Sequence, residues 1–389
     1  MSELNLPGVV VESHLHPVPS FDLADHPLPT GREEIWRFTP LDKLAPLLDE
    51  SADWAFLPGQ VTPAAGVTVG ELAPGQAPRG QVLVPVDRPS AIAARLPIAT
   101  HISLSGTIAE PVTVALTGAG PGRPQASHIV IDAQPGSHAI VVLEHTGSAV
   151  FLGNVEIIVG DGADLTVVSL QEWAADALHA GLHQALVGRD AHYRHVAMTI
   201  GGSLVRLQNN LSYAGPGGLA ELFGLYLTDG YQHQEHRLFI DQNQPKTTSR
   251  VDYRGALQGK GAHSVWVGDV LIRRNAEGID SYEANKNLLL TNGCIADSVP
   301  NLEIETGNIV GAGHSSATGR FDDEQLFYLE SRGIPEAEAR RLVVQGFFYE
   351  IIRRIGVPAI ETRLRAAVNA ELASATGDTA YQTISDEEN

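Results

Sequence analysis

The chain has 389 residues, more than one compact hydrophobic core usually supports, so its length predicts an elongated core or several domains. The 26 lysine and arginine residues against 46 aspartate and glutamate residues leave a formal charge of −20. This charge excludes the basic surface that binding to nucleic acid or anionic lipid requires. One cysteine excludes a disulfide framework, and neither a signal peptide nor an apolar run of about 18 residues is evident, so we expect a cytoplasmic protein without membrane contact.

The first region, residues 1–100, is predicted to be mostly helical. Apolar residues recur at helical spacing after an acidic turn in residues 33–48. A second helix is expected over residues 88–96, where a proline occupies the first turn. Trp36 and Phe38 are expected to pack on the core of the protein.

The second region, residues 101–315, is predicted to be a β-solenoid. Short β-rich runs recur there, each introduced by a glycine-containing turn, at residues 135–143, 161–170, 188–196, 217–227 and 259–267. Strands without interleaved helices favour a sandwich, a barrel or a solenoid over a parallel α/β sheet. The length of the region favours the solenoid, because stacked coils grow without a single spherical core.

The third region, residues 316–389, changes to a helical period. An acidic turn at residues 322–324 favours the start of one helix, Pro335 the start of a second, and residues 360–373 form a third. The second helix carries apolar residues around its whole circumference. We expect four of them to bind a partner, with burial against the core as the alternative: Phe347, Phe348, Tyr349 and Ile352. Residues 376–389 are polar and acidic and are expected to be disordered.

Enzymatic sites are incomplete along the chain. The nearest approach to a phosphate loop, residues 255–261, is one residue short and has glycine where a hydroxyl should hold magnesium. The histidine pairs His192/His195 and His233/His236 are three apart in β-type segments, so each pair projects to opposite faces and cannot share one ion. We therefore expect no catalytic residue.

Cys294 and His314 differ in their expected roles. One thiolate cannot hold an iron–sulfur cluster, so Cys294 is predicted to be a small buried residue in a core strand and the chain to have no cofactor of its own. His314 is predicted to lie in an exposed glycine-flanked loop before the helical tail. A neutral imidazole there can bind iron or pass a proton, and a histidine without a role is the alternative.

Three adjacent blocks, residues 285–290, 298–305 and 310–334, occur in an order that resembles the SufB/SufD proteins of the SUF iron–sulfur cluster assembly system. The first two resemble the last core strands of that family, and the third resembles its junction between core and tail. Further matches lie at residues 236–280, and residues 33–39 resemble the N-terminal motif of SufD. The resemblance spans most of the chain and is strongest to SufD.

This resemblance implies a right-handed parallel β-helix that acts as a non-catalytic scaffold. It implies pairing with SufB, docking of the SufC ATPase on the helical tail, and ATP bound to that partner alone. A transient iron–sulfur cluster would form at the partner interface, with His314 as the candidate metal ligand on this chain. Ala312 stands where several SufD proteins have cysteine, so the thiolates would come from SufB or from a sulfur donor. A homodimer is expected when the chain is alone.

Three alternatives remain at this point. A SufB-like paralogue shares the core and the tail. A carbohydrate-active β-helix enzyme would need paired carboxylates or a calcium cluster, whereas the core aspartates are scattered along the sequence. The scattered core aspartates are Asp161, Asp164, Asp241, Asp252, Asp269 and Asp280. A solenoid with a purely structural role is the third.

Overall fold

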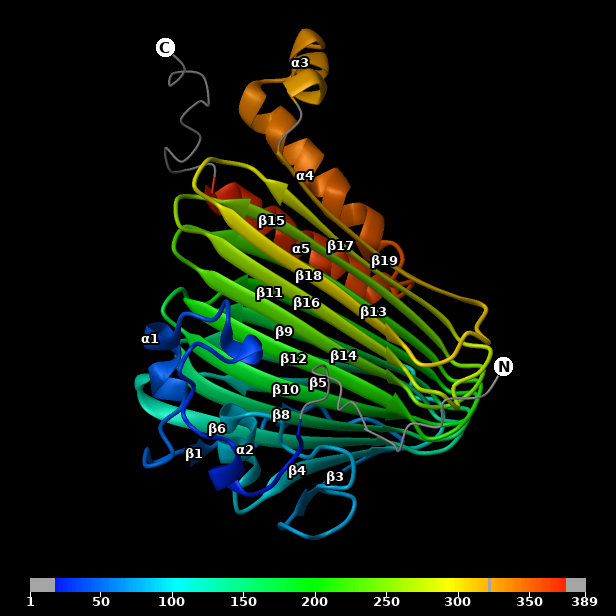
Figure 1. Ribbon diagram of the computed structural model, residues 1–389. Coiled ribbons are helices and arrows are strands. Elements are labelled where there is room, and N and C mark those ends of the chain that lie inside the picture. The colour runs from blue at the N-terminus through cyan, green and yellow to red at the C-terminus, as the bar shows by residue number, and fades with distance from the viewer. Residues whose placement is uncertain (1–17, 321–322, 376–389) are drawn as a thin grey trace, which may run out of the picture.

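The computed structural model describes residues 18–320 and 323–375. Two sheets of mainly parallel strands face each other, and helices cover parts of their outer faces (Figure 1). One sheet has ten strands, in the order β18-β16-β14-β12-β10-β8-β6-β4-β3 with β1 beside β6, and the other has nine, in the order β19-β17-β15-β13-β11-β9-β7-β5-β2. The chain alternates between the sheets, so each coil adds one strand to each, and the predicted parallel β-solenoid is confirmed.

The strands of the coils have regular lengths. Those of the ten-stranded sheet are β4 (Ala99–Leu104), β6 (Gly120–Ala133), β8 (Ala149–Val159), β10 (Leu178–Val187), β12 (Leu204–Tyr213), β14 (His233–Gln242), β16 (His263–Ile272) and β18 (Ile295–Ile304). Those of the nine-stranded sheet are β5 (Val112–Thr117), β7 (His138–Gly147), β9 (Asp164–Trp173), β11 (His192–Gly201), β13 (Leu219–Asp229), β15 (Thr248–Gln258), β17 (Asp280–Leu289) and β19 (Gly311–Arg320).

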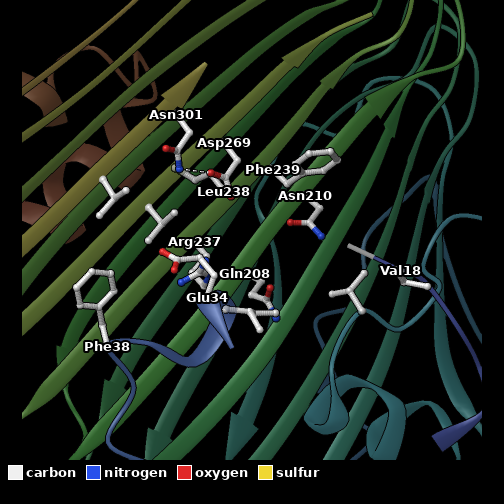
Figure 2. Close-up of a pocket in the computed structure, with 14 residues that line it drawn as sticks. Val18, Glu34, Phe38, Gln208, Asn210, Arg237, Leu238, Phe239, Asp269 and Asn301 are labelled. Carbon is white, nitrogen blue, oxygen red and sulfur yellow. Dashed lines mark hydrogen bonds between the residues drawn. The ribbon is translucent and has the colours of Figure 1, made fainter. Parts of the chain in front are cut away.

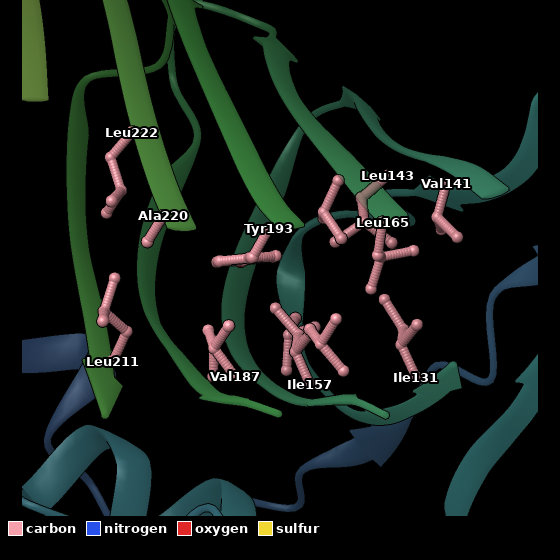
Figure 3. Close-up of a cluster of buried hydrophobic side chains, with 14 of the residues drawn as sticks. Ile131, Val141, Leu143, Ile157, Leu165, Val187, Tyr193, Leu211, Ala220 and Leu222 are labelled. Carbon is pink, nitrogen blue, oxygen red and sulfur yellow. The ribbon is translucent and has the colours of Figure 1, made fainter. Parts of the chain in front are cut away.

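The interior between the two sheets is filled by alternate residues of every strand. Val141, Leu165 and Leu222 are among the buried side chains that meet there (Figure 3). Successive coils stack in register, as in the pairing of Leu178 with Leu204, so equivalent side chains form columns along the solenoid. Gly162 opens a coil at φ 65°, a left-handed conformation that favours glycine and turns the chain into the next strand.

The N-terminal region packs on the outer face of the ten-stranded sheet. It contains η1 (Leu23–Asp25), η2 (Glu34–Trp36), α1 (Leu41–Leu44), η3 (Ala45–Leu47) and α2 (Arg88–Ala94), as well as the short strands β1 (Ala55–Phe56), β2 (Gln60–Val61) and β3 (Val67–Leu72). Trp36 lies under the guanidinium of Arg206, whose Cζ is 4.2 Å from the ring centroid. The hydroxyl of Thr39 donates to buried Glu235 at 2.7 Å. These contacts explain the tryptophan-containing motif as an anchor on the sheet.

The C-terminal helices cover the outer face of the nine-stranded sheet. Helix α3 (Asp323–Ser331) stands clear of the sheets, whereas α4 (Glu336–Ile352) and α5 (Pro358–Ala375) lie along them (Figure 1). Phe348 and Ile352 are buried with Phe223 and Met198 of the sheet. Within the part of the chain that the structure describes, no helix is long and apolar enough to span a bilayer.

Two details differ from the sequence-based expectations, and one cannot be compared. The last strand is β19 rather than the block at residues 298–305, because the glycine-rich run from Gly311 pairs with β17 along its whole length. The region predicted as mostly helical also contributes β3, which pairs antiparallel with β4. The prediction for residues 376–389 falls outside the described residues.

Candidate functional site

The solenoid ends at β18 and β19, each of which has a neighbouring strand on one side only. His314 lies within β19 and is exposed, so the expected loop is instead a strand. A strand, unlike a loop, fixes the direction in which the side chain of His314 points. His314 pairs with Glu283 on β17, and Glu283 pairs with Val251 on β15; both Glu283 and Val251 are buried.

The inward-facing side chains of β18 and β19 form what we call the open end. Its members are Ser298, Pro300, Leu302, Ile304, Ala312, His314, Ser316 and Thr318, each one coil beyond an interior residue. Ile272 is 0% exposed, whereas its register partner Ile304 is 47% exposed. The open end therefore presents the inner face of the solenoid. His314 occupies the same position on its strand as the buried residues Val251 and Glu283 do on the two preceding strands of the sheet.

Hydrogen bonds link the polar side chains of the open end to one another and to the coil beneath. Ser316 donates to the hydroxyl oxygen of Ser298 across the interior at 2.8 Å. The amide of Asn287 donates to Thr318 at 3.4 Å and to Asn285 at 2.8 Å, and Asn287 accepts from Tyr226 at 2.6 Å. This network orders the polar half of the open end without using His314.

Glu283 lies directly beneath His314 and is 1% exposed. Neither carboxyl oxygen has a hydrogen-bond partner among the described residues. Burial, with a smaller contribution from Asp269, raises the pKa of Glu283 to about 8. A Cβ at Gly268 would lie 2.4 Å from Oε2 of Glu283, so the missing side chain there makes room for the carboxyl group. Glu283 was not among the candidate residues predicted from the sequence.

The cysteine lies elsewhere. Cys294 is in the turn before β18 rather than inside a core strand, and it is only half-buried. Its thiol donates to the carbonyl of Gly259 at 3.4 Å, and burial raises its pKa above the usual value. Ala312 occupies the open end two residues before His314, so this chain presents an imidazole but no thiol on β19.

The histidines of β11 and β14 contact other side chains of the protein. His195 is buried inside the solenoid, where Nε2 lies 3.0 Å from Nδ1 of His183. Burial lowers the pKa of His195 to about 3, so the ring is neutral at physiological pH. His192, three residues earlier, faces outward as the strand period predicts and bonds Glu221. His236 is also buried and meets Thr199 at 2.9 Å.

A separate cleft of about 690 Å³ lies between the N-terminal region and the outer face of the ten-stranded sheet (Figure 2). Glu34 and Phe38 approach it from one side, and Arg237 and Asp269 from the sheet. Its charges have partners within the protein. Arg237 meets Glu235 at 3.4 Å, and Asp269 accepts from Asn301 at 2.6 Å. The cleft therefore joins the N-terminal region to the sheet and presents no evident catalytic pair.

The four apolar residues of α4 divide into two classes. Phe348 and Ile352 are buried against the sheet, so they are not available to a partner in this structure. Phe347 and Tyr349 are partly buried at the margin of the same cluster. Exposed aromatic side chains lie instead on α3, where Phe327 is 72% exposed and Tyr328 is its neighbour.

The described residues contain no group of three histidine, cysteine, aspartate or glutamate side chains that could hold a metal ion. The open end thus offers at most a part of a coordination shell.

The chain is similar to known proteins over most of its length. A family model described as the SufBD core domain of SUF system FeS cluster assembly matches residues 115–347. An iron–sulfur cluster assembly SufBD family protein of Mycobacterium bovis is 48% identical over 383 residues, which cover 94% of each chain. A SufBD family protein of Mycobacterium leprae is 49% identical over 363 residues, covering 91% of this chain and 93% of its own. The SufB protein of Bacillus subtilis is 26% identical over 229 residues, covering 58% of this chain and 49% of its own.

Proposed function

The chain belongs to the SufBD family of iron–sulfur cluster assembly proteins, and from this premise we propose that it is a non-catalytic, SufD-like scaffold of a SufBCD-type complex. In this proposal a SufB-like chain pairs with the open end and a SufC-like ATPase docks on the C-terminal helices. A transient cluster, which is the cargo of the assembly, forms where the two scaffolds meet.

The observation that carries the proposal is the position of His314 on the uncovered inner face of the last coil. Strand pairing with β17 fixes where its backbone lies, while the side chain stays exposed. A neutral imidazole binds iron readily, and a ligand held by rigid backbone needs little reorganisation. His314 would then supply one nitrogen ligand to the cluster from this side of the interface.

The remaining ligands would come from the second scaffold. Ala312 offers no sulfur beside His314, and Cys294 is in a turn outside the open end. A sulfur-rich cluster therefore requires thiolates of the SufB-like partner or persulfide delivered by a donor protein. The ATPase would provide the energy for rearranging the interface, since ATP binds to that partner alone in this proposal.

The SufD-like branch is favoured over the SufB-like branch by the alanine at position 312 on β19 and by the Trp36 anchor of the N-terminal region. The carbohydrate-active alternative loses support, because family membership points to cluster assembly and because Arg237 and Asp269 of the cleft have partners within the protein. A single free cysteine fits work in the reducing cytoplasm, where we place the complex.

The experiment that tests the proposed pairing changes an exposed valine at the margin of the open end. Val310 is 76% exposed and immediately precedes β19. Val310→Glu puts a charge where a partner would exclude water, so the amount of SufB-like chain that co-purifies should fall at least tenfold. Val69→Glu is the matched control, because Val69 is an exposed valine on β3 at the opposite end of the solenoid. Equal recovery of the partner with both variants would refute pairing at the open end.

A further inference from the structure

We propose that Glu283 and His314 form a two-residue binding site for a divalent cation, with ferrous iron as the substrate, at the open end of the solenoid. This inference rests on the proposed function and adds to it a carboxylate ligand and an entry point for the metal. It differs from a site made of His314 alone, because the oxygen ligand would come from the strand beneath.

The register places the two residues side by side on neighbouring strands. Residues 283 and 314 are paired neighbours on β17 and β19, so their Cα atoms lie about 4.8 Å apart and their side chains project to the same face. A carboxylate and an imidazole on adjacent strands can reach a common ion at the usual bond lengths of about 2.0–2.2 Å. Oxygen with nitrogen is also a donor set that first-row divalent metals accept.

The lack of hydrogen bonds to Glu283 is the second observation. A buried carboxyl group without partners costs free energy, and native proteins almost always satisfy such groups. The other carboxylates buried to this degree follow that rule. Glu156 accepts backbone N–H groups of Gly80 and Val82 at 2.8 and 2.7 Å, and Glu235 contacts Arg206 at 3.3 Å. Among these three, Glu283 alone has no hydrogen-bond partner within the described residues, so its place is open to a metal ion.

The surroundings of Glu283 hold the carboxyl group in position. Its Oε2 lies against the backbone of Gly268, and the indole of Trp266 packs over the same glycine. The indole N–H of Trp266 has no partner among the described residues either. On the side facing the end of the solenoid, the next layer consists of β18 and β19, where Pro300 follows Gly268 and exposed His314 follows Glu283. A cation would enter through the histidine, which would bind it first.

The pair supplies only two ligands, in agreement with the absence of any larger metal-binding group in residues 18–320 and 323–375. Water would complete the shell in the isolated chain, and the SufB-like partner would replace that water in the complex. The site would thus hold iron loosely until the partner's thiolates arrive.

The test measures metal binding by the full chain under anaerobic conditions, with Co(II) alone as the spectroscopic probe and Fe(II) alone in calorimetry. Wild type should bind one equivalent per chain at this site. Glu283→Gln and His314→Ala should each weaken that binding at least tenfold, and Glu283→Asp, which keeps the carboxylate, should recover part of it. Glu305→Gln is the matched control, because Glu305 is an exposed carboxylate just after β18.

Circular dichroism should show that Glu283→Gln folds as wild type, since the amide is nearly the same size as the carboxyl group. A wild-type chain that binds no Co(II), or a Glu283→Gln chain that binds it as tightly as wild type, would overturn the inference. The iron and sulfide content of the reconstituted complex distinguishes a failure of this inference from a failure of the proposed function. If Glu283→Gln leaves iron and sulfide unchanged while His314→Ala removes them, only the role of Glu283 is wrong. If neither variant changes them, cluster assembly at the open end is wrong as well.

Discussion

At the scale of single residues, His192 on the outer surface of the solenoid contacts two carboxylates. Its Nε2 lies 2.9 Å from Glu221 and its Nδ1 3.5 Å from Asp164, on the two neighbouring strands. Hydrogen bonds to Asp164 and then to Glu221 raise the pKa of His192 to about 9. The imidazolium therefore joins three strands of the nine-stranded sheet at neutral pH.

This arrangement predicts a pH-dependent contribution to stability. Because the pKa of His192 in the folded protein exceeds the value of 6.5 in the unfolded chain, the stabilisation is complete below pH 6.5 and is lost as pH rises to about 9. His192→Gln should lower the free energy of unfolding by about 1 kcal/mol at pH 6, after allowance for solvent screening, and by much less at pH 9.5. Urea unfolding at both pH values measures this, and a difference that does not change with pH would contradict the assignment.

Of the two residues of the candidate site, only His314 could be predicted from the sequence. His314 could be selected because its glycine-rich surroundings and its place before the tail are visible as a pattern. Glu283 was missed because its importance depends on burial without a partner, which only the packed structure reveals. The alternation of strand β17 gives the one usable signal, since it places an acidic residue at an inward position between Ser281 and Asn285.

At the scale of elements, the C-terminal helices differ in how they pack. Helices α4 and α5 complete a hydrophobic cluster with the nine-stranded sheet, whereas α3 packs on α4 and extends away from the sheets (Figure 1). Deleting the whole tail would uncover that cluster, so it cannot separate docking from folding. The exposed aromatic residues of α3 allow a cleaner test.

Paired substitutions on α3, Phe327→Glu and Tyr328→Glu, should reduce co-purification of the SufC-like ATPase at least tenfold. Both side chains are exposed, so the thermal unfolding midpoint should stay close to that of wild type. Leu28→Glu is the control, because Leu28 is an equally accessible apolar residue of the N-terminal region. Undiminished capture of the ATPase by the α3 variant would move the docking surface away from this helix.

The solenoid itself could be predicted because turn glycines and alternating strands repeat along the sequence. Its last strand could not, since the run from Gly311 is rich in glycine and serine and lacks the apolar residues typical of a strand. Pairing with β17 determines its conformation instead. The burial of Phe348 was likewise hidden, because a helix that is apolar all round fits either a partner or the outer face of a sheet.

At the scale of the whole molecule, the described parts of the two terminal regions cover opposite outer faces of the solenoid, and residues 18–320 and 323–375 leave the open end uncovered (Figure 1). Each sheet gains a second hydrophobic layer, so the coils are stabilised from both sides. The inner face of the last coil is the exception, with Ile304 and His314 exposed above buried residues. The proposed pairing with a second scaffold would use this end of the molecule.

The most direct measurement is the iron and acid-labile sulfide content of the complex purified with its SufB-like and SufC-like partners. With His314→Ala, the subunits should assemble in wild-type proportions, since an exposed side chain contributes little to folding. Iron and sulfide should fall at least fivefold, while His138→Ala, which removes an exposed histidine of β7, should leave both unchanged. A His314→Ala complex that carries wild-type iron and sulfide would contradict the account.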